Sequence, residues 1–198
     1  MHVLTVFCHP RPDSFTAAIA AAFRAGLAES GHDGELADLY AEGFDPLVLP
    51  PDEPDWSDAT KRYSDAVLAE QARIERHQAI AMVFPVWWWS FPAMLKGWID
   101  RVWNRGWAYD ESRLRLERGI LIGVASGGPK TYDGPRGYRA AMETQLVLGI
   151  LDYCSVPRGR LELLMGSTDD DATRADLLRR AHALGRDFAL ADSAAVAT

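Results

Sequence analysis

The sequence is poor in the residues that build covalent cross-links and metal centres. Its 198 residues include two cysteines, Cys8 and Cys154, and neither belongs to a CxxC pair or to a cluster of histidines and cysteines. This spacing argues against a zinc site and gives no support to a disulfide. We therefore expect two reduced, buried thiols.

Long apolar runs and basic runs are also missing. No segment reaches the roughly 18 consecutive apolar residues of a membrane-spanning helix, and the first residues show no basic leader followed by a long apolar stretch. The net charge is -7 and the isoelectric point is about 5.2. This acidic balance argues against nucleic acid or an anionic membrane as the main partner. We expect a cytoplasmic protein that inserts into no membrane.

Several common active-site motifs are absent. The chain has neither GxGxxG nor GxxxxGK[ST], which argues against the usual dinucleotide-binding fold and against a P-loop nucleotidase. We also find no Ser-His-Asp arrangement and no paired-carboxylate site.

The residues that are present indicate a globular α/β domain. Hydrophobic residues make up 48% of the chain and charged residues 25%. One domain is expected over residues 1–190, with a flexible tail at 191–198. Apolar runs predict strands at His2–Cys8, Gly34–Tyr40, Gln78–Phe84, Gly119–Ser126 and Gly159–Met165. Helical patterns lie between them, at Ser14–Ser30, 56–76, Pro92–Asn104, Gly137–Cys154 and Asp170–Ala191.

This alternation predicts a parallel sheet with helices on both faces. In such sheets ligands bind beyond the carboxyl ends of the strands. After the first strand, "HPRPDSFT" places Ser14 at a helix start, where an anion such as a phosphate is favoured. The alternative is that Ser14 serves only as a helix cap.

The loop after the third strand holds three consecutive tryptophans, Trp87, Trp88 and Trp89. They predict a flat apolar wall for a planar ligand, or else core or interface packing. After the fourth strand, Gly127 and Gly128 allow close backbone approach and Tyr132 offers a hydroxyl, although an ordinary glycine turn explains them as well. Together the three loops describe one crevice that suits a flavin.

The same residues resemble the flavodoxin-like NAD(P)H:quinone oxidoreductases, the family that includes DT-diaphorase and the ancillary flavoproteins of potassium-efflux systems. The likeness runs over roughly residues 3–188, and the segment "FPVWWWSFPAMLKGWIDRVW" is its most specific part. It implies a flavodoxin-like three-layer sandwich with a five-stranded parallel sheet of order 2-1-3-4-5. It also implies bound FAD, with FMN as the alternative, and a homodimer whose active site lies at the subunit boundary.

The resemblance also implies roles for individual residues. It assigns the flavin phosphates and ribityl chain to His9, Ser14, Phe15 and Thr16, and the isoalloxazine to Pro85, Val86, Trp87, Trp88, Trp89, Ser126, Gly127, Gly128 and Tyr132. Arg174 falls near a contact to the adenine half of FAD. Tyr132, Trp107 and Tyr109 are implied as catalytic residues, the latter two across the dimer.

The sequence departs from the family pattern at two places. Thr16 stands where many members have Asn, and still offers a hydroxyl. A family histidine in the loop after Tyr132 has no clear equivalent, and Arg136 or Arg139 is the candidate replacement.

The implied activity is two-electron reduction of a quinone or another flat aromatic acceptor, such as a nitroaromatic or azo compound. NAD(P)H would pass hydride to flavin N5 and leave before the acceptor enters, which predicts ping-pong kinetics. One alternative is a redox-sensing regulatory subunit that docks on a transporter or another partner. A one-electron carrier fits less well, because its phosphate loop is typically rich in serine and threonine, unlike "HPRPDSFT".

Overall fold

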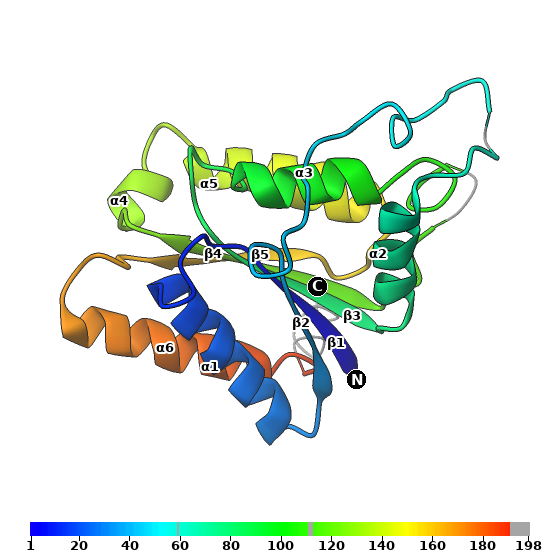
Figure 1. Ribbon diagram of the computed structural model, residues 1–198. Coiled ribbons are helices and arrows are strands. Elements are labelled where there is room, and N and C mark those ends of the chain that lie inside the picture. Colours follow the sequence, from blue (N-terminus) through cyan, green and yellow to red (C-terminus); the bar gives the residue numbers. More distant parts are fainter. Residues whose placement is uncertain (59, 111–112, 191–198) are drawn as a thin grey trace, which may run out of the picture.

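A computed structural model describes residues 1–58, 60–110 and 113–190, so the predicted flexible tail at 191–198 lies outside the described residues. The chain forms three layers around a five-stranded sheet (Figure 1). The strands are β1 (His2–Phe7), β2 (Asp33–Asp38), β3 (Ala79–Pro85), β4 (Arg118–Ala125) and β5 (Arg160–Met165). All neighbouring strands are parallel, in the order β2-β1-β3-β4-β5, which confirms the predicted topology.

Helices cover both faces of the sheet. One face carries α1 (Phe15–Glu29) and α6 (Asp171–Arg186), which lie side by side in Figure 1. The other carries α2 (Asp65–Glu75), α3 (Ala93–Val102), α5 (Tyr138–Met142) and the π-helix η1 (Glu143–Asp152) that continues α5. A single-turn helix, α4 (Pro129–Tyr132), follows β4.

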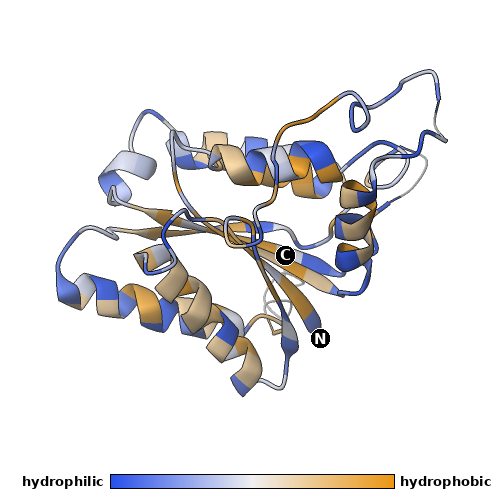
Figure 2. Ribbon diagram, viewed as in Figure 1, coloured by the Kyte–Doolittle hydropathy of each residue, from blue (hydrophilic) through white to orange (hydrophobic). Residues whose placement is uncertain are grey.

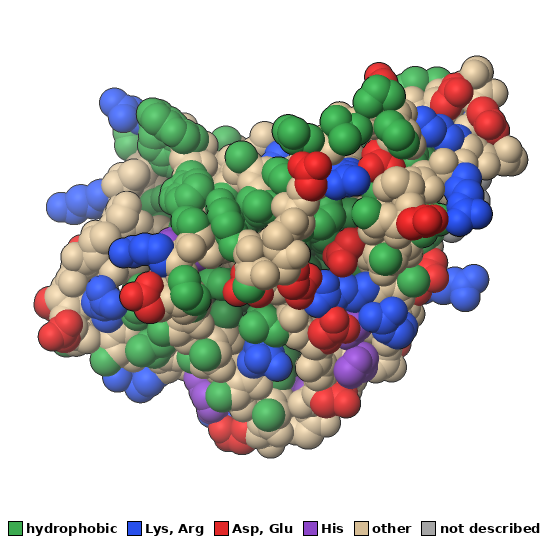
Figure 3. Space-filling model, viewed as in Figure 1, with side chains coloured by type: hydrophobic (Ala, Val, Ile, Leu, Met, Phe, Trp, Pro, Cys, Tyr) green, Lys and Arg blue, Asp and Glu red, His purple; other side chains and the backbone are tan. Residues whose placement is uncertain are grey.

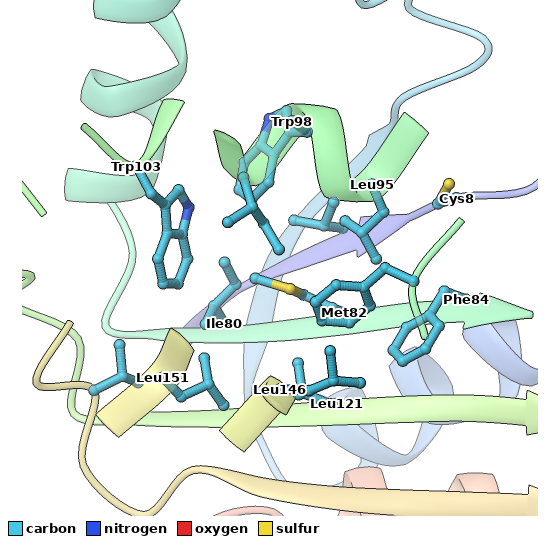
Figure 4. Close-up of a cluster of buried hydrophobic side chains, with 14 of the residues drawn as sticks. Cys8, Ile80, Met82, Phe84, Leu95, Trp98, Trp103, Leu121, Leu146 and Leu151 are labelled. Atoms are coloured by element: carbon cyan, nitrogen blue, oxygen red, sulfur yellow. The ribbon is translucent and has the colours of Figure 1, made fainter. Parts of the chain in front are cut away.

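The central strands are buried on both faces, which explains why their sequences are almost continuously apolar. Every residue of β3 and β4 is buried. Side chains of β3 alternate between two cores: Ile80, Met82 and Phe84 face α3 and η1 (Figure 4), and the residues between them face α1 and α6. Figure 2 shows the same pattern, with apolar strands inside and polar residues on the outer sides of the helices.

The helix predictions were partly wrong. The helix expected over 56–76 begins only at Asp65, because Ser64 caps its first turn by accepting a hydrogen bond from Val67 N at 3.4 Å. The helix expected over Gly137–Cys154 exists, but most of it has π-type hydrogen bonding. The short helix α4 was not predicted, since a single turn leaves no periodic pattern.

Both cysteines are buried and free, as predicted. Burial raises the pKa of the Cys8 thiol to about 12 and that of Cys154 to about 11, so both stay protonated at neutral pH. Among the described residues, no helix is long and apolar enough to cross a membrane.

A buried ion pair holds the long loop between β2 and α2 against α3. Asp52 is 1% exposed, and its carboxylate accepts hydrogen bonds from Arg101 Nε at 2.8 Å and from the Ser64 backbone N–H at 2.9 Å. Arg101 also donates to the carbonyl of Asp45. Burial alone would raise the pKa of Asp52, but these hydrogen bonds and the charge of Arg101 outweigh it, and the net pKa is lowered.

Replacing Asp52 with Asn is expected to lower the free energy of unfolding by about 3 kcal/mol at pH 7, because Arg101 keeps a buried charge without its partner. The folded-state pKa of Asp52 lies below its unfolded value. Its stabilisation is therefore complete above roughly pH 4 and disappears as the pH falls through the lowered pKa. Urea unfolding at pH 7 and pH 3 measures both effects.

The control is Asp187→Asn, which removes one partner of an exposed pair with Arg186. This substitution should change the urea midpoint of unfolding little, since exposed ion pairs are screened by solvent. Equal effects of the two variants would contradict a structural role for the Asp52–Arg101 pair.

Candidate functional site

Two adjoining hollows open at the carboxyl edge of the sheet. The first hollow, of about 370 Å³, lies among the loops after β1, β3 and β5, and the second, of about 190 Å³, lies between the tryptophan loop and the loop after β4. They share the lining residues Val86 and Ser126, so the two hollows lie side by side, and together they are called the cleft. Of the predicted cofactor residues, the first hollow has His9, Ser14, Phe15, Thr16, Pro85, Val86, Trp87, Ser126 and Arg174 in its lining, and the second has Val86, Trp88, Trp89, Ser126, Gly127 and Tyr132.

The remaining predicted residue of this group, Gly128, lines neither hollow. It is the residue before α4, and a Cβ on it would meet open space. The structure thus brings together the predicted residues from three separate loops, although these loops are distant in the sequence.

The first hollow is suited to an anion. Ser14 caps α1 as predicted, with its Oγ accepting a hydrogen bond from Ala17 N at 3.2 Å. The remaining N–H groups of the first helical turn and the helix dipole favour negative charge at this end. Arg11 and Arg174 add two positive side chains to the lining, against the one negative side chain of Asp13. A phosphate or diphosphate is the ligand chemistry that matches this set.

His9 adds a hydrogen-bond donor to the same hollow. Its Nδ1 lies 3.0 Å from the Arg11 backbone nitrogen and 3.2 Å from the Arg11 carbonyl oxygen, and the shorter contact, in which Nδ1 accepts, fits a neutral ring with its proton on Nε2. Burial lowers the pKa of His9, and the positive charge of Arg11 lowers it further. A neutral imidazole with Nε2–H can donate to a ligand oxygen at physiological pH.

Arg174 and Phe15 make a shelf at the rim of the first hollow. The guanidinium carbon of Arg174 lies 4.4 Å from the centroid of the Phe15 ring, within cation–π range. The contact depends on close packing of α1 against α6, where a Cβ on Gly26 would fall 2.0 Å from the His182 carbonyl oxygen. A flat ligand group has an aromatic and guanidinium surface to lie against here.

The second hollow is bounded by a tight turn formed by residues 87–90. Trp87 and Ser90 exchange backbone hydrogen bonds of 3.3 and 3.1 Å, and the two central residues, Trp88 and Trp89, have φ angles of 51° and 54°. Hairpin turns with two such residues normally use Asn-Gly. Two tryptophans in the left-handed region cost roughly 1–2 kcal/mol each. Backbone strain of this kind gathers at functional sites.

The two central tryptophans differ in their surroundings. Trp88 is 88% exposed, whereas Trp89 is half-buried and stacks on Tyr138, with ring centroids 4.0 Å apart and an interplanar angle of 18°. The sequence left ligand wall and packing as alternatives. The structure shows that Trp89 packs against α5 and also lines the second hollow, while Trp88 offers its indole to the cleft.

Tyr132 closes the other side of the second hollow. It is 5% exposed, and burial raises the pKa of its phenol, so the hydroxyl keeps its proton and can donate a hydrogen bond. Arg136 and Arg139, the candidate replacements for the family histidine, line neither hollow. Arg139 is paired instead with the Asp133 carboxylate, which lowers the pKa of Asp133.

Trp107 and Tyr109 lie away from this cleft within one chain. Trp107 Nε1 donates to Glu75 at the end of α2, 2.7 Å away, which places it at the amino edge of the sheet. The Tyr109 ring lies 5.5 Å from that of Tyr153, which is 61% exposed, and both line a groove of about 270 Å³ over α3 and η1. The cross-dimer role predicted for Trp107 and Tyr109 stays a prediction.

Sequence reasoning missed part of the lining. Ser167 and Thr168 directly follow β5, so the rule of inspecting each strand end would have found them. Thr131 is hidden in the unpredicted helix α4, and its side chain lies about 3.2 Å from where a Cβ of Gly127 would be. Tyr153 carries no local signal, because its place beside Tyr109 depends on the tertiary fold.

Comparison with known proteins agrees with the geometry. A family model described as flavodoxin-like fold matches residues 1–184. An Escherichia coli protein named uncharacterized NAD(P)H oxidoreductase YcaK is 41% identical over 131 residues, which cover 66% of this chain and 67% of that protein. NAD(P)H dehydrogenase (quinone) 1 of Rattus norvegicus is 29% identical, with 85% of this chain and 71% of the rat protein covered.

A solved structure gives the same result. The NAD(P)H:quinone oxidoreductase from Methanothermobacter marburgensis superimposes with a TM-score of 0.91 at 32% identity, and 96% of this chain and 97% of that chain are covered. The chain belongs to the flavodoxin-like family that includes NAD(P)H:quinone oxidoreductases, as the resemblance of its motifs indicates.

The strained turn leads to a stability prediction. Replacing Trp88 with Asn, which tolerates left-handed backbone, should raise the free energy of unfolding by about 1 kcal/mol, since Trp88 is exposed and contributes little packing. Chemical denaturation of the ligand-free protein measures this. Trp89→Asn is the matched control: it also relieves a left-handed residue but loses the Tyr138 stack, so no gain is expected. A lower free energy of unfolding in Trp88→Asn would contradict the inference that the left-handed backbone at Trp88 is strained.

Proposed function

We propose that the protein is a flavin-dependent oxidoreductase that uses NAD(P)H to reduce quinones or similar flat aromatic acceptors by two electrons. The observation that carries this proposal is the cleft, in which a helix start suited to an anion adjoins a hollow lined by tryptophans and Tyr132. The names of the relatives, which are NAD(P)H oxidoreductases and quinone dehydrogenases, support the reaction.

The residues present fit a flavin. Its phosphate end matches the start of α1, with Ser14 and Thr16 buried at the base of the first hollow and His9 as a donor. Its ring matches the second hollow, where Trp88, Trp89 and Tyr132 supply aromatic surface and a hydroxyl. The Arg174–Phe15 shelf favours FAD over FMN, because FAD has a second phosphate and an adenine to place there.

The chain supplies binding, orientation and hydrogen bonds, and no residue of it has to react covalently. When bound, the flavin would accept hydride from NAD(P)H at N5 and return two electrons to the acceptor, in ping-pong order. Tyr132, kept protonated by burial, would be able to donate a hydrogen bond to a flavin held in the second hollow and so stabilise negative charge on it. The exposed indole of Trp88 is available to contact a flat second substrate.

A homodimer is part of this proposal. Exposed apolar side chains lie on the loop before α2 and at η1, and Figure 3 shows hydrophobic side chains over that loop. A second copy of the chain would cover this surface. The largest of these exposed side chains are Leu47, Leu49, Trp56, Leu148 and Tyr153. A second copy docked here would present Tyr109 and Tyr153 to the partner's cleft and so complete the acceptor site.

The same apolar surface also supports the second candidate, a redox-sensing regulatory subunit that docks on a transporter or another partner. The two candidates differ in what the protein does alone. Steady NAD(P)H oxidation by the purified protein with a simple quinone supports the enzyme. Turnover that appears only with a partner supports the regulatory subunit.

Cofactor content gives the first test. Heat-denatured protein should release one flavin per chain, which its absorption spectrum detects, and mass spectrometry should identify it as FAD. Protein purified without flavin should take up FAD on reconstitution. If the folded chain binds neither FAD nor FMN, the oxidoreductase proposal fails.

Steady-state kinetics give the second test. Double-reciprocal plots at several fixed benzoquinone concentrations should give parallel lines, because reductant and acceptor use the same hollow in turn. Intersecting lines would contradict a shared site. The preference between NADH and NADPH follows from the same measurements.

Arg174→Ala tests the assignment of FAD. Loss of the shelf over Phe15 should weaken FAD binding about 10-fold, which corresponds to roughly 1.4 kcal/mol, and should leave FMN binding unchanged. Arg179→Ala, on the same helix but paired with Asp176, is the control. Titration of flavin-free protein measures each dissociation constant, and equal losses for FAD and FMN would place Arg174 at the shared phosphate instead.

A further inference from the structure

The geometry points to Tyr138 and Gln145 as positioning residues that hold the strained 87–90 turn in its left-handed form and keep the second hollow shaped before its ligand arrives. This inference rests on the proposed flavin site but concerns a separate property, the energy needed to form the hollow. Neither residue lines the cleft.

The turn is not stabilised by its own sequence. Two consecutive tryptophans with positive φ oppose the conformation, and Trp88 is too exposed to offset this cost by packing. Within the turn, the Trp87–Ser90 backbone hydrogen bonds favour the closed form, and the rings of Trp88 and Trp89 meet only at 6.2 Å between centroids. Contacts from outside the turn have to supply the rest.

Two such contacts come from one helical run. Tyr138, the first residue of α5, stacks on Trp89. Gln145, in η1, accepts a hydrogen bond on its Oε1 from Ser90 Oγ at 3.2 Å. Both residues thus reach the turn from the single helical run that α5 and η1 form.

The helical run is itself well anchored. Met142 and Leu146, which lie between and beside the two contacts, are about 1% exposed and belong to the core formed with α3 and β3. Leu146 is among the core residues labelled in Figure 4. Because the helix is anchored, its contacts can restrain the turn. Gly137, which has a left-handed backbone, places Tyr138 at the helix start.

Without the contacts from Tyr138 and Gln145, the 87–90 turn relaxes, and the ligand has to restore its shape on binding. This cost weakens the affinity for the ligand. We expect Tyr138→Ala to raise the dissociation constant of FAD for the flavin-free protein about 10-fold, as measured by quenching of flavin fluorescence. Tyr138→Phe keeps the stacking ring and should stay within about twofold of the parent. Gln145→Ala removes the single hydrogen bond and should weaken binding about threefold.

Coupling to Trp88 separates positioning from a general structural defect. In the Trp88→Asn background the turn no longer stores strain at that residue, so adding Tyr138→Ala should cost less than threefold in affinity. A general loss of folding would produce the same loss in both backgrounds. Equal losses, or no loss from Tyr138→Ala in the parent, would overturn the inference.

The same pair of substitutions is measured without flavin. Unfolding free energies of the two single variants and the double variant should show that Tyr138→Ala is less destabilising when Asn replaces Trp88. If the parent protein binds no flavin, the proposed function fails. The unfolding energies of the parent, the two single variants and the double variant still decide the inference about Tyr138. Additive unfolding energies would show that Tyr138 does not restrain the turn.

Discussion

The whole arrangement depends on the burial of a parallel sheet from both sides. Because β1, β3 and β4 have almost no exposed side chain, their backbone hydrogen bonds form a rigid, water-free platform. Parallel strands also end at the same edge, so three loops that are far apart in the sequence meet there. The cleft is the direct geometric result: helix start, tryptophan turn and glycine loop each follow one of these strands.

Close packing of α1 against α6 adds a further side to the cleft, beyond the three loops. Gly26 and Gly185 let the two helix backbones approach so closely that a Cβ on either would fall 2.0 Å from a carbonyl oxygen of the other helix. Both helices start at the same edge of the sheet, so their first turns bring Phe15 and Arg174 into contact. A helix contact in the protein interior thus positions a charged group at the mouth of the cleft.

Much of this could be predicted from the sequence, and the exceptions have physical causes. Near-continuous apolar runs revealed the strands and their parallel arrangement, the family resemblance supplied the strand order, and the residues after each strand revealed most of the cleft. The helix predicted over 56–76 was wrong in its first half, because Asp52 and Arg101 hold that loop through contacts between distant residues. The partnership of Tyr109 with Tyr153 and that of Trp89 with Tyr138 also arise only from tertiary packing, which no local pattern records.

The adjacent left-handed tryptophans have an evolutionary consequence. Random substitution followed by selection for heat resistance alone would favour glycine or asparagine at position 88, because these residues remove a backbone penalty there and the exposed Trp88 contributes little packing. Such variants would be more stable but would have less aromatic surface beside the second hollow. Retention of the Trp88 indole across many generations would then require selection on ligand capture, and its loss would mark lineages in which this chain serves another purpose.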